Sequence, residues 1–279
     1  MQGGFSCGDG GVVECTDRHE EVIGLSGVCV RRGEATILDH IDWRVMQGEN
    51  WLLMGANGSG KTSLLSVLAG YLTPSEGEVR VCGKTYGEFP WQELRAMLGL
   101  VSSSVKRMIR PEFTALEIVA SGKGAVVNPW ETADPADILR AEKMLVSAGL
   151  EKLSSRTWEL LSQGERQRIL ICRAMMADPK LLILDEPCSG LDPVARRHFL
   201  DFVQATATAA GGPPVVFVTH HVEEITPAFT HVLILKNGRA LACGSIEEAL
   251  REDYLSEAFG EPVRLSKSKS GRWRLEDAQ

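Results

Sequence analysis

The 279-residue sequence has no long apolar run, no paired-cysteine motif and no excess of positive charge. Its apolar stretches, such as 181–184 and 232–235, are far shorter than the roughly 18 residues of a membrane-spanning helix. Seven scattered cysteines without a C-x-x-C pair argue against a disulfide framework or a zinc site and favour a reducing compartment. Lys and Arg number 30 against 37 Asp and Glu, so the net charge of −7 does not indicate nucleic-acid binding.

The start of the chain also lacks a targeting pattern. Residues 1–11 are glycine-rich and do not show the charged and then apolar layout of a signal peptide. Neither internal repeats nor sustained heptads are present. We therefore expect a cytoplasmic protein that does not cross a membrane by itself.

Short apolar segments alternate with helical patterns along the chain. Strands are expected at 41–45, 51–54, 79–81, 181–184, 215–219 and 232–235. Helices are expected at 62–69, 91–97, 114–120, 134–148, 193–210 and 222–225. Asn237-Gly238 between two apolar segments predicts a hairpin. The alternation predicts an α/β fold with a mainly parallel sheet, separated into two halves by a helical insertion.

A glycine-rich loop follows the expected strand at 51–54. Its sequence GANGSGKT fits the pattern G-x-x-x-x-G-K-[ST], which binds phosphates through backbone amides and the N-terminus of the next helix. We expect Lys61 to reach the β and γ phosphates and the Thr62 hydroxyl to ligate Mg²⁺. The alternative is a turn that merely begins a helix. The residues expected to bind nucleotide here are Gly55, Ala56, Asn57, Gly58, Ser59, Gly60, Lys61, Thr62 and Ser63.

Two adjacent carboxylates end the apolar strand at 181–184. In open α/β sheets, ligands bind at the carboxyl ends of the strands. Asp185 is expected to hold Mg²⁺, and Glu186 to polarise the water that attacks the γ phosphate. Solvated turn acids are the alternative, but the phosphate-binding loop in the same chain favours the catalytic interpretation.

The third motif is LSQGE at 161–165. Ser162 and Glu165 have the spacing of a capping box, and a helix N-terminus with a serine and a bare glycine is also an anion site. The P-loop, LSQGE and LLILDEP, in this order, resemble the ATP-binding cassette (ABC) ATPases over about residues 25–244.

The resemblance implies a P-loop NTPase core of the RecA type, an antiparallel β subdomain and an inserted helical subdomain. The expected division is an N-terminal flexible arm at 1–20, a single cassette at 21–250 and a C-terminal helix with a polar tail at 251–279. Within the cassette, 21–89 and 161–250 would form the core with its β subdomain, and 90–160 the helical subdomain. ATP and Mg²⁺ are the ligands that the resemblance implies.

The resemblance also implies a homodimer in which two cassettes pack head to tail. Ser162 and Gly164 would contact the γ phosphate held by the partner subunit's Lys61, and residues 189–192 would cross the interface. His220 matches the switch histidine, which senses the γ phosphate and orients the water. Taken alone, His220 would more often be an ordinary polar residue at a strand end. His221 matches no family role.

Two positions depart from the family pattern. Ser103 stands where a glutamine usually contacts Mg²⁺ and relays the nucleotide state, and a serine is shorter, so a water would have to bridge. Arg32 stands where an aromatic residue usually stacks on adenine. Its guanidinium either stacks on the base instead or is a solvated loop charge.

Three functions remain open. The first is a transporter motor that drives a separate membrane permease from the cytoplasm or the cytoplasmic face of the membrane, docked on the helical subdomain. Trp91, Phe113 and Trp130 are candidate contacts for it or are buried inside the subdomain. No direct nucleic-acid binding is expected.

The second function is a soluble cassette ATPase that acts on a nucleic-acid or ribosomal partner. The basic stretch at 267–274 and the serine run around Ser103 favour it, although that stretch also fits a solvated tail. The third is a binding module that uses ATP only as a switch. The joint presence of Lys61, Thr62, Asp185, Glu186 and His220 argues against this third function.

Overall fold

A six-stranded sheet forms the centre of the computed structural model, which describes residues 20–124, 133–268 and 271–277. The strand order is β10-β9-β3-β8-β7-β6, parallel throughout except for β10. The strands are β3 (Trp51–Met54), β6 (Leu98–Val101), β7 (Leu181–Asp185), β8 (Val215–Thr219), β9 (His231–Lys236) and β10 (Arg239–Ser245). The predicted α/β fold with a mainly parallel sheet is confirmed.

A second, antiparallel sheet has the order β2-β1-β4-β5. Its strands are β1 (Glu21–Arg32), β2 (Ala35–Met46), β4 (Glu76–Val81) and β5 (Lys84–Thr85). The sequence predicted parts of β2 and β4 but missed β1. Register irregularities interrupt β1 between Leu25 and Val28 and again before Val30, and its burial shows no regular alternation.

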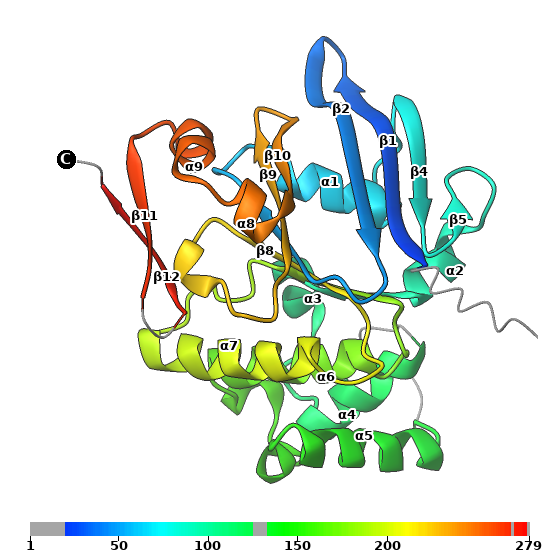
Figure 1. Ribbon diagram of the computed structural model, residues 1–279. Helices are drawn as coiled ribbons and strands as arrows, with labels where there is room; N and C mark the ends of the chain where they lie inside the picture. Colours follow the sequence, from blue (N-terminus) through cyan, green and yellow to red (C-terminus); the bar gives the residue numbers. More distant parts are fainter. Residues whose placement is uncertain (1–19, 125–132, 269–270, 278–279) are drawn as a thin grey trace, which may run out of the picture.

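Neighbouring residues of each central strand point to opposite faces of the sheet. Trp51 and Leu53 pack on one face with the antiparallel sheet and with α1 (Lys61–Leu68). Leu52 and Met54 pack on the other face with α6 (Gln163–Met175) and α7 (Pro193–Ala207). The two layers flank the central sheet in Figure 1, with α1 and the antiparallel sheet above and α6 and α7 below. The helix of the P-loop and the helix of the LSQGE motif therefore lie on opposite faces.

The helical insertion follows β6 and returns to α6. It contains α3 (Ser103–Met108), α4 (Ala115–Ala120), η1 (Ser121–Gly124), α5 (Pro135–Ser147), η2 (Glu151–Leu153) and η3 (Trp158–Leu160). The expected start at residue 90 is wrong, because α2 (Trp91–Ala96) packs on the core through Leu94, and β6 pairs with β7. Trp130 and the expected arm, apart from Glu20, lie outside the described residues.

The C-terminal part contains α8 (Ile246–Ala249), α9 (Glu252–Phe259), β11 (Val263–Lys267) and β12 (Trp273–Asp277). The expectation of a polar tail after the helix is wrong, because β11 and β12 form an antiparallel hairpin. Leu265, Trp273 and Leu275 are partly buried against the core. The Leu275 amide donates a hydrogen bond of 3.3 Å to Oε1 of Glu223 in η4 (Val222–Glu224), the short 3-10 turn that replaces the expected helix there. Apolar side chains on every second residue therefore anchor the basic segment.

A further boundary differs from the sequence prediction. Helix α7 ends at Ala207 instead of residue 210, and residues 211 and 212 lie in the loop before β8. The hairpin predicted at Asn237-Gly238 is confirmed, with positive φ at both residues. Among the described residues, no helix combines the length and the apolar character that crossing a membrane requires.

Candidate functional site

The carboxyl ends of β3, β8, β7 and β6 lie side by side at one edge of the central sheet. This is the edge at which open α/β sheets bind ligands. The loops that leave it carry the P-loop after β3, His220 after β8, Asp185 and Glu186 at the end of β7, and Ser103 after β6. The topology thus gathers residues from four separate stretches of the chain.

The P-loop has the backbone geometry of a phosphate cradle. Gly55 has a φ of 146°, and a Cβ there would lie 2.3 Å from the Leu235 carbonyl oxygen, so no side chain fits. Gly58 and Gly60 also have positive φ values. The Gly238 amide, at the tip of the β9–β10 hairpin, donates a hydrogen bond of 2.9 Å to the Ser59 carbonyl and holds the loop from behind. The exposed amides of this loop can therefore point at an anion.

Lys61 is buried at the start of α1 and folds back over the P-loop. Its Nζ donates hydrogen bonds to the carbonyl oxygens of Gly55 at 2.8 Å and Ala56 at 3.0 Å. Burial lowers the pKa of the ammonium, while the nearby Glu186 and Asp185 carboxylates raise it. The ammonium therefore lies inside the P-loop, where it can contact a bound phosphate.

Asp185 and Glu186 stand together at the end of β7. Burial first, and then the charge of Glu186, raise the pKa of the Asp185 carboxyl, whereas Lys61 lowers it. Glu186 has a φ of 46°, a left-handed conformation that is uncommon outside glycine, and its amide donates a hydrogen bond of 3.1 Å to the Val218 carbonyl. Such local strain is concentrated at functional sites. The bond to β8 holds the Glu186 backbone beside the strand that carries His220.

His220 and Glu186 lie beside each other in the lining of a small cavity of about 140 Å³. Its Nδ1 lies 3.4 Å from Oε1 of Glu186 and forms no hydrogen bond with the residues that the structure describes. Both side chains are partly exposed, His220 at 34% and Glu186 at 40%. An imidazole and a carboxylate in this arrangement can share or orient a water molecule.

Ser162 caps the N-terminus of α6. The Ser162 hydroxyl accepts a hydrogen bond from the Glu165 amide, and the Glu165 carboxylate accepts one from the Ser162 amide, which completes the predicted capping box. Ser162 is exposed, and an added Cβ on Gly164 would meet nothing closer than 3.7 Å. Gln163 donates a hydrogen bond of 2.6 Å to the Ser189 carbonyl. The motif is therefore an open helix N-terminus tied to the loop that follows β7.

The two departures from the family pattern, Ser103 and Arg32, are both exposed side chains. Ser103 is exposed at the start of α3, where Ser102 accepts the capping hydrogen bond from the Val105 amide. Arg32 is exposed at the end of β1. Neither side chain reaches into the P-loop by a hydrogen bond within the described parts of the chain.

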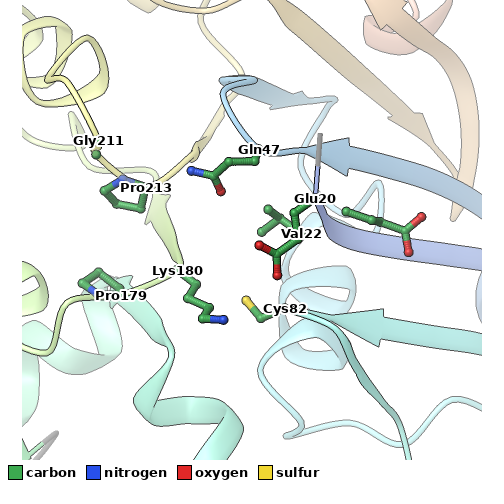
Figure 2. A pocket seen from close by; sticks show the side chains of 10 residues that line it. Glu20, Val22, Gln47, Cys82, Pro179, Lys180, Gly211 and Pro213 are labelled. Atoms are coloured by element: carbon green, nitrogen blue, oxygen red, sulfur yellow. The ribbon is translucent and has the colours of Figure 1, made fainter. Parts of the chain in front are cut away.

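A larger hollow of about 370 Å³ lies at the opposite edge of the sheet, near the amino ends of β7 and β8 (Figure 2). The Lys180 amine points into it toward the Cys82 thiol, and Glu20 and Gln47 line the wall. Burial raises the pKa of the Cys82 thiol to about 11, so this sulfur stays protonated and unreactive at neutral pH. The hollow is larger than the cavity at Glu186, but it contains none of the residues that the motifs predicted.

The sequence predictions missed two residues beside His220. Glu224 and Arg196 line the same cavity as His220 and Glu186. In the sequence, Glu224 follows another glutamate and resembles an ordinary solvated acid, yet it is only 2% exposed. No local sequence pattern predicts this burial, because it depends on packing between η4 and α7.

Comparison with known proteins agrees with this geometry. The family model described as ABC transporter matches residues 38–189. The chain is 41% identical over 245 residues to the ABC transporter ATP-binding protein YlmA of Bacillus subtilis (strain 168), covering 88% of this chain and 93% of that protein.

Solved structures agree as well. The ADP conformation of MJ1267, an ATP-binding cassette of an ABC transporter, superposes with a TM-score of 0.71 at 25% identity over 85% of this chain and 95% of that one. A dimeric post-hydrolysis state of the cassette MJ0796 with ADP and phosphate gives 0.67 at 25% identity, over 81% of this chain and 99% of the other. The family model covers more than half of the chain, and YlmA is 41% identical to it. The chain therefore belongs to the ATP-binding cassettes of the ABC transporter family.

Proposed function

We propose that two copies of this ATP-hydrolysing cassette bind two ATP molecules between them, head to tail, and drive a separate membrane permease. The observation that carries the proposal is the arrangement of the two phosphate-binding elements. The P-loop helix α1 and the LSQGE helix α6 pack on opposite faces of one sheet. This placement supports a second copy that brings its LSQGE motif to the γ phosphate, and the post-hydrolysis structure of the cassette MJ0796 is dimeric.

Each ATP would be held mainly by one P-loop. The amides of residues 57–62 and the Lys61 ammonium would bind the phosphates, and the N-terminus of α1 adds a partial positive charge. Ser63 follows in the first turn of the helix. From the partner, Ser162 and Gly164 would close the site over the γ phosphate.

The residues present fit a magnesium ion. Asp185 is a partly buried carboxylate whose pKa is raised, and the buried Ser59 hydroxyl has no hydrogen-bond partner among the described residues. Thr62 carries a further hydroxyl at the start of α1. Thr62 and Asp185 would hold the ion, Asp185 through water, and Ser103 would reach it only through a bridging water. Bound Mg²⁺ neutralises charge on the β and γ phosphates.

Hydrolysis would depend on Glu186 and His220. Glu186 accepts the proton of the attacking water, and His220, 3.4 Å away, orients that water and contacts the γ phosphate. Lys61 stabilises the charge that develops on the phosphoryl oxygens. The protein thus supplies position and charge, which is how phosphoryl transfer is generally catalysed.

We propose that the guanidinium of Arg32 stacks on the nucleobase in place of an aromatic ring. Because such a contact at an exposed site is worth about 0.5–1 kcal/mol, we expect Arg32→Ala to raise the KM for ATP about two- to fivefold. Arg32→Tyr should restore or lower the KM. A stacking contact does not read the base edges, so GTP should compete well with ATP. Initial rates over a range of ATP concentrations test this, and an unchanged KM in Arg32→Ala means that the residue is a solvated charge.

We further propose that the permease binds the helical insertion. YlmA is an ABC transporter ATP-binding protein, and the insertion 102–160 offers exposed apolar side chains, among them Met108, Leu139 and Val146. Of the candidate contacts, Trp91 is partly buried on the face of the central sheet with α1, and Phe113 is partly buried on the face with α6. The cassette would then work at the cytoplasmic face of a membrane.

Affinity purification tests the permease. We expect the tagged full-length chain to sediment with membranes, together with one integral membrane protein whose gene neighbours its own. The washed complex should hydrolyse ATP. A chain that stays in the soluble fraction and co-purifies with ribosomes or nucleic acid would instead support the alternative of a non-transport cassette ATPase.

A further inference from the structure

Glu224 is a buried carboxylate in the short turn η4, four residues after the switch histidine. Its side chain is 3% exposed. Burial raises the pKa of this carboxyl, while the hydrogen bond from Thr219 and the charges of Arg196 and His220 lower it. A buried carboxylate is costly unless it is hydrogen-bonded, so its partners indicate why it is there.

One oxygen of Glu224 fixes both neighbours of His220. The Thr219 hydroxyl donates a hydrogen bond of 2.6 Å to Oε2 of Glu224. The same hydroxyl accepts a hydrogen bond of 3.0 Å from the His221 amide. Because Thr219 and His221 flank His220, this chain of two hydrogen bonds constrains the backbone on both sides of it.

The other oxygen of Glu224 faces α7. Nε of Arg196 lies 3.9 Å from Oε1 of Glu224 and forms no hydrogen bond within the described residues. Asp192 caps the N-terminus of α7, and its carboxylate accepts hydrogen bonds from the Val194 and Ala195 amides. Glu224 therefore lies between the turn that carries His220 and the helix that follows the loop 189–192.

We propose that Glu224 is a positioning residue for ATP hydrolysis. Through the Thr219 hydroxyl it holds the His220 ring against Glu186, and through Arg196 it links this turn to α7. The inference rests on the proposed roles of Glu186 and His220. Glu224 is not part of the P-loop after β3, which would bind the nucleotide.

The expected signature is a loss of turnover without a loss of ATP binding. A shift of about 1 Å in a catalytic group can cost about 100-fold in rate, so we expect Glu224→Ala to lower kcat by about 10- to 100-fold. The KM for ATP should stay within about twofold of wild type, because the P-loop is untouched. Glu224→Gln keeps an oxygen that can accept from Thr219 and should retain more activity than Glu224→Ala.

Variants of Thr219 test the same chain of hydrogen bonds from its other end. Thr219→Val removes the hydroxyl at similar volume and should lower kcat as much as Glu224→Ala, whereas Thr219→Ser should recover most of it. Since Thr219→Val and Glu224→Ala interrupt the same series of hydrogen bonds, the variant that carries both should lose about as much activity as either single variant. If Glu224→Ala does not fold, Thr219→Val and Thr219→Ser still test the positioning role.

Glu223→Gln is the matched control, because Glu223 is the exposed neighbour in the same turn and its bond to the hairpin survives the change. It should hydrolyse ATP at nearly the wild-type rate. The positioning role is overturned if Glu224→Ala and Thr219→Val keep wild-type kcat, or if KM rises in step with any loss. If Glu186→Gln hydrolyses ATP normally, the proposed site fails instead, so the two failures are distinguishable.

Discussion

Replacing Glu186 with glutamine should stop ATP turnover and leave the protein as a dimer with ATP trapped between the subunits. Glutamine has the shape of glutamate but cannot accept the proton of the attacking water. Loss of a preorganised catalytic group typically costs about 10²- to 10³-fold in rate, or about 3–4 kcal/mol. The ATP contacts of the P-loop remain. Phosphate release and light scattering after size exclusion, both with Mg·ATP, measure the two effects.

The charge balance of the site explains why the trapped dimer should accumulate. Asp185 and Glu186 place two carboxylates at one strand end, and burial first, and then repulsion from Glu186, raise the pKa of Asp185. Removing one of these charges lowers the repulsion that a bound triphosphate meets. Glu186→Gln should therefore bind ATP at least as tightly as wild type. Near-normal turnover, or a monomer at saturating Mg·ATP, would show that Glu186 does not activate the water.

The parts of the site that could be predicted from the sequence are those in which a few adjacent residues carry the chemistry. The P-loop, the acids after β7 and the LSQGE motif each lie within eight residues or fewer, and each sits next to a strand or helix with a clear pattern. The central strand β3 is a short, fully apolar run, and β7 and β8 are apolar up to their last residues, Asp185 and Thr219. Such local signals survive without knowledge of the packing.

The missed features depend on contacts between distant segments. Strand β1 does not show the regular alternation of apolar and polar residues that predicts a strand, because its register is irregular. In the hairpin β11–β12, Arg and Lys are interspersed with the apolar side chains of Leu265, Trp273 and Leu275. The composition of this segment therefore suggests a charged, solvated tail. Glu224 becomes a buried acid only when η4 meets α7. Pairing and burial of this kind are properties of the tertiary structure, and one sequence does not display them.

Replacing Ser162 with arginine should separate nucleotide binding from dimerisation. Ser162 is exposed at the N-terminus of α6, on the face of the sheet opposite α1, so an arginine there can point into solvent in the monomer. The lost cap costs about 0.5–2 kcal/mol of stability, and Glu165 still accepts from the backbone amide of residue 162. ATP should bind the monomer with wild-type affinity, because no P-loop residue changes.

In the dimer, the same arginine would occupy the space that the γ phosphate of the partner's ATP requires. We therefore expect Ser162→Arg, introduced into the Glu186→Gln background, to convert the ATP-trapped dimer into an ATP-bound monomer. Ser162→Ala in that background separates the two effects of the change, because it removes the same capping hydroxyl without adding bulk; it should still dimerise, although more weakly. A fluorescent nucleotide titration and light scattering measure both steps. If the arginine variant dimerises like its parent, Ser162 does not lie against the partner's nucleotide and the two cassettes do not pack head to tail.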